Sequence, residues 1–354
     1  MKGTSILITL LSAATKAAAH GYVSNIVING VSFRGWLPSE DPYNSNPPIG
    51  VGWQTPNLSN GFVTPDETDT DSIICHYNAT NARGHATVAA GDKIYIQWQP
   101  TPWPDSHHGP VIDYLANCGA SCETVDKTTL EFFKIDGPGL IDGSSVPGIW
   151  ADDQLIANGN GWLVQIPAAI APGNYVLRHE IIALHGAGSA NGAQLYPQCV
   201  NLAITGSGSV SPAGIPAVDF YTPTDPGILI NIYQALASYI VPGPSLIPQA
   251  SSIVQSSSAI TATGTPTSGS GSGTTATTSN PGTTTTSTTS TTLTTTTSRV
   301  TTTTTTTTTT SGGSTTTQTL YGQCGGSSWT GATACPAAAT CTSYSTFYAQ
   351  CVPA

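Results

Sequence analysis

The chain has 354 residues, of which 8% are charged, and its 19 acidic residues outnumber its nine basic ones. Residues 20–249 hold all of the acidic residues and six of the basic ones, and a protein surface of this charge repels nucleic acid and anionic membranes. A neutral substrate fits this charge better, and no stretch after the first 19 residues is long and apolar enough to span a bilayer.

Residues 1–19 have the features of a secretory signal peptide. Lys2 supplies a positive charge, residues 6–11 are apolar, and the three alanines at 17–19 form a small-residue cleavage site. Cleavage after Ala19 leaves His20 as the first residue of a secreted, extracellular protein. The free α-amine and the imidazole of an N-terminal histidine can chelate one metal ion. An internal histidine cannot do this, because its backbone nitrogen is an amide.

Residues 20–249 are expected to form one β-rich domain. Alternating apolar and polar residues predict strands at 93–98 and 162–166, and further strands are predicted at 174–185 and 200–205. Helical patterns are weak, and residues 226–239 are the best short candidate. Many short strands between long loops predict an all-β fold, an immunoglobulin/fibronectin-like antiparallel β-sandwich with long loops.

The eight cysteines fall into two groups of four, as disulfides in an oxidising compartment require. Cys118 and Cys122 have a possible spacing for zinc ligands, but no matching second pair follows, so disulfides are favoured. Asn57 and Asn78 each begin an Asn-X-Ser/Thr triplet and are candidate glycosylation sites. The two groups are Cys75, Cys118, Cys122 and Cys199, followed by Cys324, Cys335, Cys341 and Cys351.

Residues 250–317 are dominated by Thr, Ser, Gly and Pro, with an unbroken threonine run at 301–310. This composition cannot bury a core, so we predict a disordered linker that dense O-glycosylation keeps extended. Aromatic residues and cysteines return at 318–354, which predicts a small β module stapled by disulfides. Its four cysteines allow three pairings, and their order along the chain does not choose among them.

The strongest internal motif is the segment 102–114, which carries His107 and His108 side by side. Neighbouring side chains of an extended chain point in different directions, so one of the two is expected to reach a given metal. Together with His20, that histidine would place two imidazoles and one amine in a plane, with a phenol above or below it. Three nitrogens in a tetragonal arrangement suit copper(II). For three other histidines we expect structural hydrogen bonds: His76, His85 and His179.

Two separate sets of motifs resemble known fungal families. The first set is similar to the fungal lytic polysaccharide monooxygenases of auxiliary-activity family nine and spans residues 20 to about 245. It consists of His20-Gly-Tyr-Val, Ser106-His-His-Gly-Pro-Val, residues 173–185 and residues 194–199. The second set resembles a fungal family-one carbohydrate-binding module for cellulose. It consists of Tyr321, Cys324-Gly-Gly and the closing cysteines Cys341 and Cys351.

The first resemblance implies a copper-binding histidine brace. Its ligands would be the amine and imidazole of His20 and the imidazole of His107, with Tyr196 in the axial position. His107 is chosen over His108 because the family's ligand is the first histidine of this pair. Asp105 and His108 are then structural neighbours of the site.

Further roles follow from the same resemblance. His185 and Gln194 match the pair that hydrogen-bonds oxygen species near the metal, and such partners orient and tune metal ligands. Tyr43 and Tyr221 match aromatic residues on the flat surface that faces the substrate.

The implied activity is the oxidation of crystalline cellulose. An external electron donor, a small molecule or a redox protein, reduces the copper. Oxygen or peroxide is then used to hydroxylate C1 or C4 of a glucosyl unit, which breaks the glycosidic bond without hydrolysis. Cellulose, and other β-glucans with it, is therefore the expected polysaccharide partner, and a monomer is the expected state.

The second resemblance implies the disulfides Cys324–Cys341 and Cys335–Cys351. It also implies that flat aromatic rings of the module stack on glucosyl rings, with Gln350 as an additional hydrogen-bonding candidate. These rings belong to Tyr321, Phe347 and Tyr348.

Two other functions stay open at this point. A glycoside hydrolase such as an endoglucanase needs two carboxylates across the scissile bond, and Glu131 and Glu180 are candidates, but no motif pairs them. A non-catalytic protein that binds cell walls or scavenges copper would share the module. The products would distinguish these functions: oxidised sugars, plain reducing sugars or none.

Overall fold

The computed structural model describes residues 21–56, 61–99, 103–268, 317, 323–325, 332–337, 339–345 and 348–353. The predicted signal peptide, the predicted ligand His20, the candidate glycosylation site Asn57 and most of the predicted linker lie outside these residues. The chain divides into two compact units, residues 1–271 and residues 272–354.

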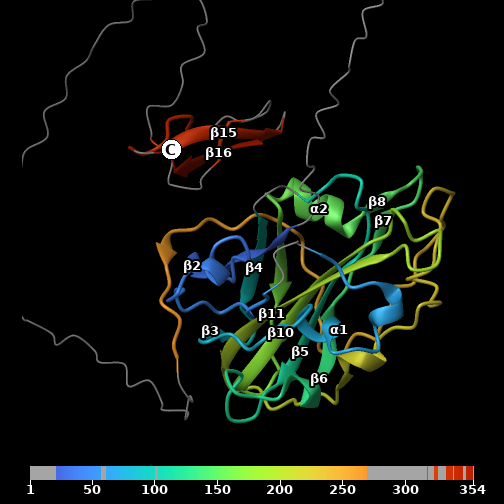
Figure 1. The fold of residues 1–354 in the computed structure, drawn as a ribbon, viewed down its shortest axis with the longest axis horizontal. Helices are drawn as coiled ribbons and strands as arrows, with labels where there is room; N and C mark the ends of the chain where they lie inside the picture. Colours follow the sequence, from blue (N-terminus) through green and yellow to red (C-terminus); the bar gives the residue numbers. More distant parts are fainter. Residues whose placement is uncertain are drawn as a thin grey trace, which may run out of the picture. The chain divides into compact units, whose positions relative to one another are not determined.

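The larger unit is a sandwich of two β-sheets (Figure 1). The first sheet has the order β13-β2-β1-β4-β9 and the second has the order β12-β6-β5-β10-β11-β3. The β3–β11 and β2–β13 pairs are parallel, and the other pairs in these two sheets are antiparallel. The predicted all-β sandwich is therefore confirmed, and the four predicted strands correspond to β4, β9, β10 and β11.

The strands of the first sheet are β1 (Tyr22–Ile28), β2 (Val31–Arg34), β4 (Lys93–Gln99), β9 (Gly161–Gln165) and β13 (Ala262–Thr263). The strands of the second sheet are β3 (Ala86–Ala89), β5 (Val111–Asn117), β6 (Glu131–Asp136), β10 (Gly173–Ala183), β11 (Gln194–Thr205) and β12 (Ile215–Pro216). A separate hairpin consists of β7 (Leu140–Asp142) and β8 (Ile149–Trp150).

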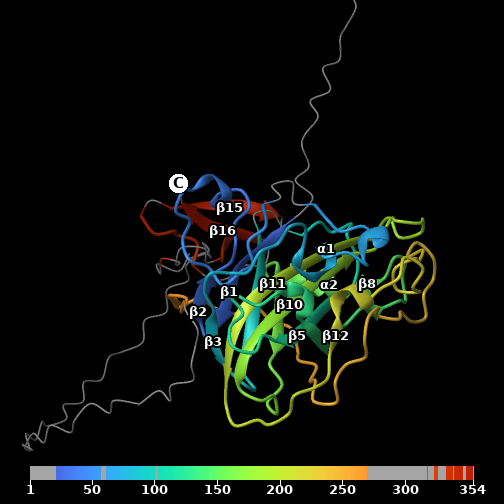
Figure 2. The same ribbon diagram turned by 60° about the horizontal axis from the view of Figure 1, so that its bottom comes forward.

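The second sheet is buried on both faces, because alternate residues of its central strands are apolar on each side. On β10, Leu177 and Ile181 belong to the core between the sheets, whereas Val176 and Ile182 belong to a second core on the outer face. Helix α1 (Ser72–Cys75), whose place beside this sheet is seen in Figure 2, and residues from 217 to 241 contribute to this second core. The disulfide Cys75–Cys199 fastens α1 to β11.

Helices are short among the described residues. Besides α1 they are α2 (Ala151–Ala157) and the 3₁₀ helices η1 (Asp41–Tyr43), η2 (Pro65–Glu67), η3 (Lys127–Thr129) and η4 (Ala217–Asp219). The best helix candidate, residues 226–239, does not form a helix, and the amide of Ile230 donates to the carbonyl of Ala187 at 2.8 Å rather than within its own segment. No helix in the described ranges is long and apolar enough to cross a membrane.

Residues 250–268, called the strap below, pack along the first sheet (orange in Figure 1). The side chain of Gln255 accepts from the amide of Leu163 at 2.8 Å and donates to its carbonyl at 2.9 Å. Ile253 and Ile260 pack on apolar side chains of the outer face, and β13 pairs with β2. The predicted linker boundary at residue 250 is therefore too early, since these side chains provide enough apolar surface and hydrogen bonds to dock.

The smaller unit contains a three-stranded antiparallel sheet in the order β14-β16-β15. Its strands are β14 (Gln323–Gly325), β15 (Ala339–Ser345) and β16 (Tyr348–Pro353). Its disulfides join Cys324 to Cys341 and Cys335 to Cys351, the pairs that the resemblance implies. In the larger unit, Cys118 is joined to Cys122.

The predicted stacking face of the smaller unit stays a prediction. Tyr321 and Phe347 lie outside the described residues. Tyr348 and Gln350 lie on β16, where their backbone is described and their side chains are not.

Candidate metal centre

The hairpin of β10 and β11 brings three predicted site residues to one end of the sandwich. Ala183, the last residue of β10, pairs with Gln194, the first residue of β11, and Ile181 pairs with Tyr196. His185 follows β10 by two residues and therefore lies at the same end of the hairpin. Gln194 and Tyr196 are two positions apart on one strand, so their side chains share a face.

The loop between β4 and β5 brings His107 to this end as well. Strand β5 lies next to β10, and the contact continues into the loop, where the amide of Leu184 donates to the carbonyl of His108 at 2.8 Å. The rings of His107 and His185 lie 4.0 Å apart between centroids, with 32° between their planes. The Nδ1 atom of His107 lies 3.2 Å from Ser106 Oγ, which makes Nε2 the candidate metal ligand of this ring.

Tyr196 is buried beside these histidines, with an exposed fraction of 1%. Its hydroxyl donates to Oε1 of Gln194 at 2.6 Å. Burial raises the pKa of Tyr196 well above its ordinary value, so the phenol stays protonated at neutral pH. A neutral phenol is a weak metal ligand and suits a weak axial contact to a metal.

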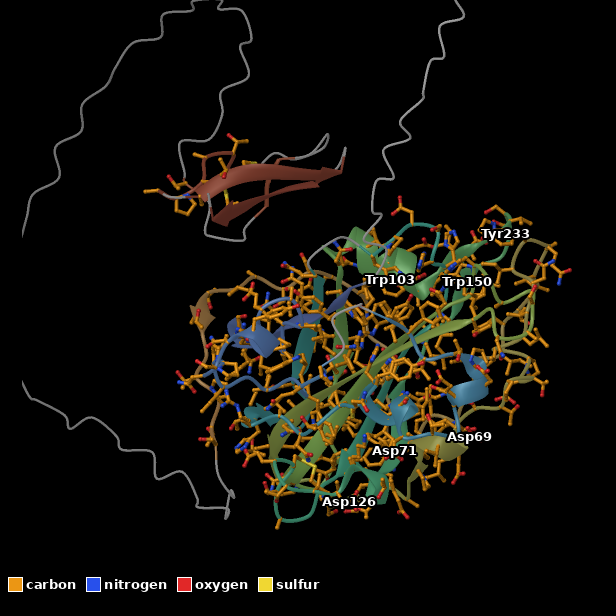
Figure 3. All side chains as sticks on the ribbon, viewed as in Figure 1. Asp69, Asp71, Trp103, Asp126, Trp150 and Tyr233 are labelled. Carbon is orange, nitrogen blue, oxygen red and sulfur yellow. A yellow bond between two sulfur atoms is a disulfide. The ribbon has the colours of Figure 1, made fainter. Side chains whose placement is uncertain are left out.

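Trp103 packs against two of the candidate ligands. Its ring meets the ring of His107 edge-on at 5.7 Å and the ring of Tyr196 edge-on at 5.0 Å between centroids. Its indole N–H donates to Asp152 in α2 at 2.9 Å, and Figure 3 shows Trp103 close to this helix. The role of Trp103 was missed in the sequence, although this residue lies inside the 102–114 motif. An aromatic residue within a ligand loop is the signal that could have found it.

His108 faces a different set of groups from His107. Its Nδ1 atom lies 3.2 Å from a carboxylate oxygen of Asp153, and its backbone carbonyl accepts from Leu184. This contact fits the expected structural role of His108. Asp105, the other expected structural neighbour, is exposed.

The other three histidines form the structural hydrogen bonds that were expected. Nε2 of His76 lies 2.7 Å from the carbonyl of Gly61, and Nδ1 of His85 lies 2.8 Å from Glu123. His179 is fully buried, between Asp113 at 2.7 Å and the indole N–H of Trp98 at 2.9 Å.

Strand β1 begins two residues after the predicted ligand His20. Its first residue, Tyr22, pairs with Gln99, the last residue of β4, and the loop with His107 starts directly after Gln99. A Cβ atom at Gly21 would lie 3.3 Å from the carbonyl oxygen of Gln99. The backbone just after His20 therefore lies where the loop of His107 begins.

The two predicted substrate-facing tyrosines have opposite environments. Tyr43, in η1, is 72% exposed. Tyr221 is buried; its hydroxyl lies 2.8 Å from the hydroxyl of Tyr114 and donates to Glu180 at 2.5 Å. The prediction for Tyr221 is therefore wrong, because a ring enclosed in the second core cannot stack on a sugar. The motif match rested on residue type and carried no information about burial.

Tyr233 is an exposed tyrosine that the sequence analysis missed. It is 57% exposed and lies in a loop tied to the chain after His185 by the hydrogen bond from Ile230 to Ala187 (Figure 3). Its exposure could not be predicted from the sequence, because residue type alone does not distinguish an exposed tyrosine from a buried one.

The two carboxylates that a hydrolase would need do not share a site. Glu180 is fully buried and accepts hydrogen bonds from Arg178 at 2.7 and 2.9 Å. Glu131, at the start of β6, is exposed. The histidines, in contrast, meet beside a buried phenol, so the structure gives no support to a hydrolytic site built on these two glutamates.

Comparison with known proteins agrees with this geometry. Residues 20–239 match Auxiliary Activity family 9 (formerly GH61), and residues 320–348 match the fungal cellulose binding domain. The AA9 family lytic polysaccharide monooxygenase G of Emericella nidulans is 76% identical over 270 residues, which cover 75% of this chain and 99% of that protein. The AA9 family lytic polysaccharide monooxygenase cel61A of Hypocrea jecorina is 58% identical over 352 residues, which cover 99% of each chain.

A solved structure gives the same result. The extended catalytic domain of H. jecorina LPMO9A aligns with a TM-score of 0.68 and 58% identity, and the alignment covers 71% of this chain and 100% of that one. The chain belongs to auxiliary activity family 9, the copper-dependent lytic polysaccharide monooxygenases. It is an oxidoreductase that cleaves polysaccharides oxidatively, and its C-terminal module is a fungal cellulose-binding domain.

Proposed function

We propose that the enzyme holds one copper ion between His20, His107 and Tyr196 and cleaves crystalline cellulose at C1, at C4 or at both. The observation that carries this proposal is the packing of the His107 and His185 rings, 4.0 Å apart, beside the hydrogen-bonded pair of Tyr196 and Gln194. Imidazole and amine nitrogens with a weak axial oxygen are a donor set that suits copper(II).

The described residues fit this metal. His107 is buried, with its Nδ1 atom beside Ser106, so the Nε2 atom serves as the ligand. His20 supplies its amine and imidazole once the signal peptide has been removed. The same signal peptide directs the enzyme out of the cell. The protonated phenol of Tyr196 would supply a third, weakly bound ligand group.

The bound copper supplies the redox chemistry, with electrons from an external donor and with oxygen or peroxide as the oxidant. The protein orients the reacting groups. The hydroxyl of Tyr196 donates to Oε1 of Gln194 and so orients this side chain, whose amide N–H group would be available as a hydrogen-bond donor beside the bound copper. His185 stacks on His107 and would help to orient this ring as a copper ligand.

Binding to cellulose requires neutral, flat contact surfaces. Tyr43 and Tyr233 are exposed rings of the larger unit that suit the apolar faces of sugars. In the module, the rings of Tyr321, Phe347 and Tyr348 stack on cellulose, and Gln350 adds a hydrogen bond. A monomer suffices for this activity. N-glycosylation is proposed at Asn57 and at Asn78, which is exposed.

The test is mass spectrometry of the soluble products from microcrystalline cellulose, with and without a reductant. We expect oxidised cello-oligosaccharides that require both the reductant and copper. A variant with one extra alanine before His20 is the matched control, because it retains every side chain but converts the amine into an amide. Its copper affinity should fall by at least about tenfold. Plain reducing sugars without a reductant, or tight copper binding by the extended variant, would contradict the proposal.

A further inference from the structure

The loop that carries His107 is held by a buried carboxylate of helix α2. Asp152 is 1% exposed and accepts two hydrogen bonds from this loop. The indole N–H of Trp103 donates to its Oδ2 atom at 2.9 Å, and the amide of Gly109 donates to its Oδ1 atom at 3.0 Å. The amide of Asp152 donates back to the carbonyl of Gly109 at 3.3 Å. Asp152 therefore fixes the loop on both sides of His107.

Trp103 connects Asp152 to the candidate ligands. The indole N–H that donates to Asp152 also donates to the backbone carbonyl of His107 at 3.2 Å. The same indole packs edge-on against the rings of His107 and Tyr196. A displacement of this indole would therefore change the surroundings of His107 and Tyr196 together.

The loop has little room to adjust by itself. A Cβ atom at Gly109 would lie 1.8 Å from the carbonyl oxygen of Ile182 on β10, so the backbone is pressed against that strand. The amide of His107 donates to the carbonyl of Pro104 at 2.9 Å. Asp152 is the side chain that links the Trp103 indole to this fixed backbone, because it accepts from both Trp103 and Gly109.

The adjacent carboxylate completes this framework. Asp153 lies 3.2 Å from Nδ1 of His108 and accepts from the amide of Trp150 at 2.7 Å. One ring nitrogen of His108 and one carboxylate oxygen each of Asp152 and Asp153 lie within 4.8 Å of one another, a spacing that could hold a metal ion. In this structure Asp152 and Asp153 accept hydrogen bonds from Trp103, Gly109 and Trp150, so the cluster supports the loop through hydrogen bonds.

We propose that Asp152 is a positioning residue for the metal centre, which acts through Trp103 and Gly109 to hold His107 in the orientation that binds copper. This inference rests on the proposed function, in which His107 is a ligand. Removal of an outer hydrogen-bonding partner typically changes metal affinity or activity about 10–100-fold. Asp152 acts through the loop rather than on the imidazole itself, so we expect the lower end of this range.

The experiment compares three variants of the full chain with a processed N-terminus. Asp152→Asn keeps the size of the side chain but turns an NH₂ group towards Trp103 or Gly109. Trp103→Phe keeps an aromatic ring against Tyr196 but removes the indole donor. Asp136→Asn is the matched control, because Asp136 also accepts from an indole N–H, that of Trp162 at 3.0 Å, but on β6.

We expect about tenfold weaker copper(II) binding by calorimetry, and an altered copper EPR spectrum, for Asp152→Asn and Trp103→Phe. The control should keep the affinity and spectrum of the unsubstituted protein. Thermal melting shows which variants fold. If Asp152→Asn does not fold, the copper affinity and EPR spectrum of Trp103→Phe test the proposal.

A folded variant with a lowered melting temperature but an unchanged affinity and spectrum would show a purely structural role and overturn the inference. The proposed function is checked separately. If the unsubstituted protein binds copper and His107→Ala does not, an unchanged Asp152→Asn spectrum contradicts the positioning role alone. If the unsubstituted protein binds no copper, the proposed function fails, and the inference with it.

Discussion

His107 and His108 are neighbours in the chain but have different partners. The ring of His107 packs on His185 and Trp103, whereas that of His108 faces Asp153. We therefore expect His107→Ala to abolish tight copper binding and oxidative cleavage. His108→Ala should keep the copper and lower the free energy of unfolding by about 1–2 kcal/mol, because it loses one partly exposed hydrogen bond to a carboxylate. Calorimetric copper titration and urea unfolding of both variants measure these effects. The opposite pattern of copper binding would reverse the ligand assignment.

Asp136 is a buried carboxyl whose titration should appear in the folding stability. Burial raises its pKa from 3.8 to about 7, the nearby charge of Asp113 adds to this increase, and the hydrogen bond from Trp162 opposes it. Because the folded state holds this proton more tightly, the stabilisation present below about pH 4 is lost as the pH rises to about 7.

Asp136→Asn should therefore flatten the decrease in the free energy of unfolding between pH 4 and pH 7. Urea denaturation at several pH values measures this slope. A variant whose slope equals that of the unsubstituted protein would show that Asp136 does not titrate in this range.

The strap is an element that completes the first sheet. Gln255 forms two hydrogen bonds with the backbone of Leu163 on the edge strand β9, and β13 pairs with β2. Ile253 and Ile260 cover apolar side chains between these two edges. Unpaired edges and exposed apolar side chains are sites of aggregation, so the strap protects this face.

Two truncations test the strap. Removal of residues 269–354 should leave the melting temperature of the larger unit unchanged. Removal of residues 250–354 should lower its free energy of unfolding by about 2–4 kcal/mol, because the isoleucine contacts and the Gln255 hydrogen bonds are lost. The corresponding decrease in melting temperature is about 5–10 °C. Calorimetry of both forms measures it, and equal melting temperatures would show that the strap contributes nothing to stability.

The molecule as a whole separates catalysis from attachment. The larger unit contains its own sheets and two disulfides, and the smaller unit contains a sheet stapled by two others. Residues 318–354 contain no Asp, Glu, Lys or Arg, whereas residues 20–249 carry all 19 acidic residues. Attachment to a neutral polysaccharide through the module should therefore depend on stacking rather than on charge.

Tyr348→Ala in the full chain should weaken binding to microcrystalline cellulose about fivefold or more. The upper guide for this effect is the stacking of aromatic rings on nucleic-acid bases, which contributes roughly 1–3 kcal/mol per ring. High salt should change the binding little, because no charged group of the module takes part. Depletion isotherms of both proteins at low and high salt provide the measurement. Binding that collapsed in salt, or that ignored the loss of the ring, would contradict a stacking mechanism.

Local patterns were sufficient to predict the sandwich and several of its strands. Period-two alternation of apolar residues gave β4 and β9 correctly, because this pattern depends on neighbouring residues alone. The even groups of cysteines predicted disulfides, and all eight cysteines are paired. The family could be recognised because its short motifs, such as the one around His107, are contiguous stretches of sequence, and the ligand assignments stay predictions.

The burial of side chains and their hydrogen-bond partners could be determined only from the folded structure. Tyr221 and Tyr233 are the same residue type, but the first is enclosed beside Glu180 and the second is exposed. Residues 250–268 have the composition of a linker, yet they dock on β9. Asp152 accepts a hydrogen bond from Trp103, which lies 49 residues away in the sequence. Such contacts join residues that are far apart in sequence, so their geometry is set by how the two sheets and their loops pack, and no local pattern records it.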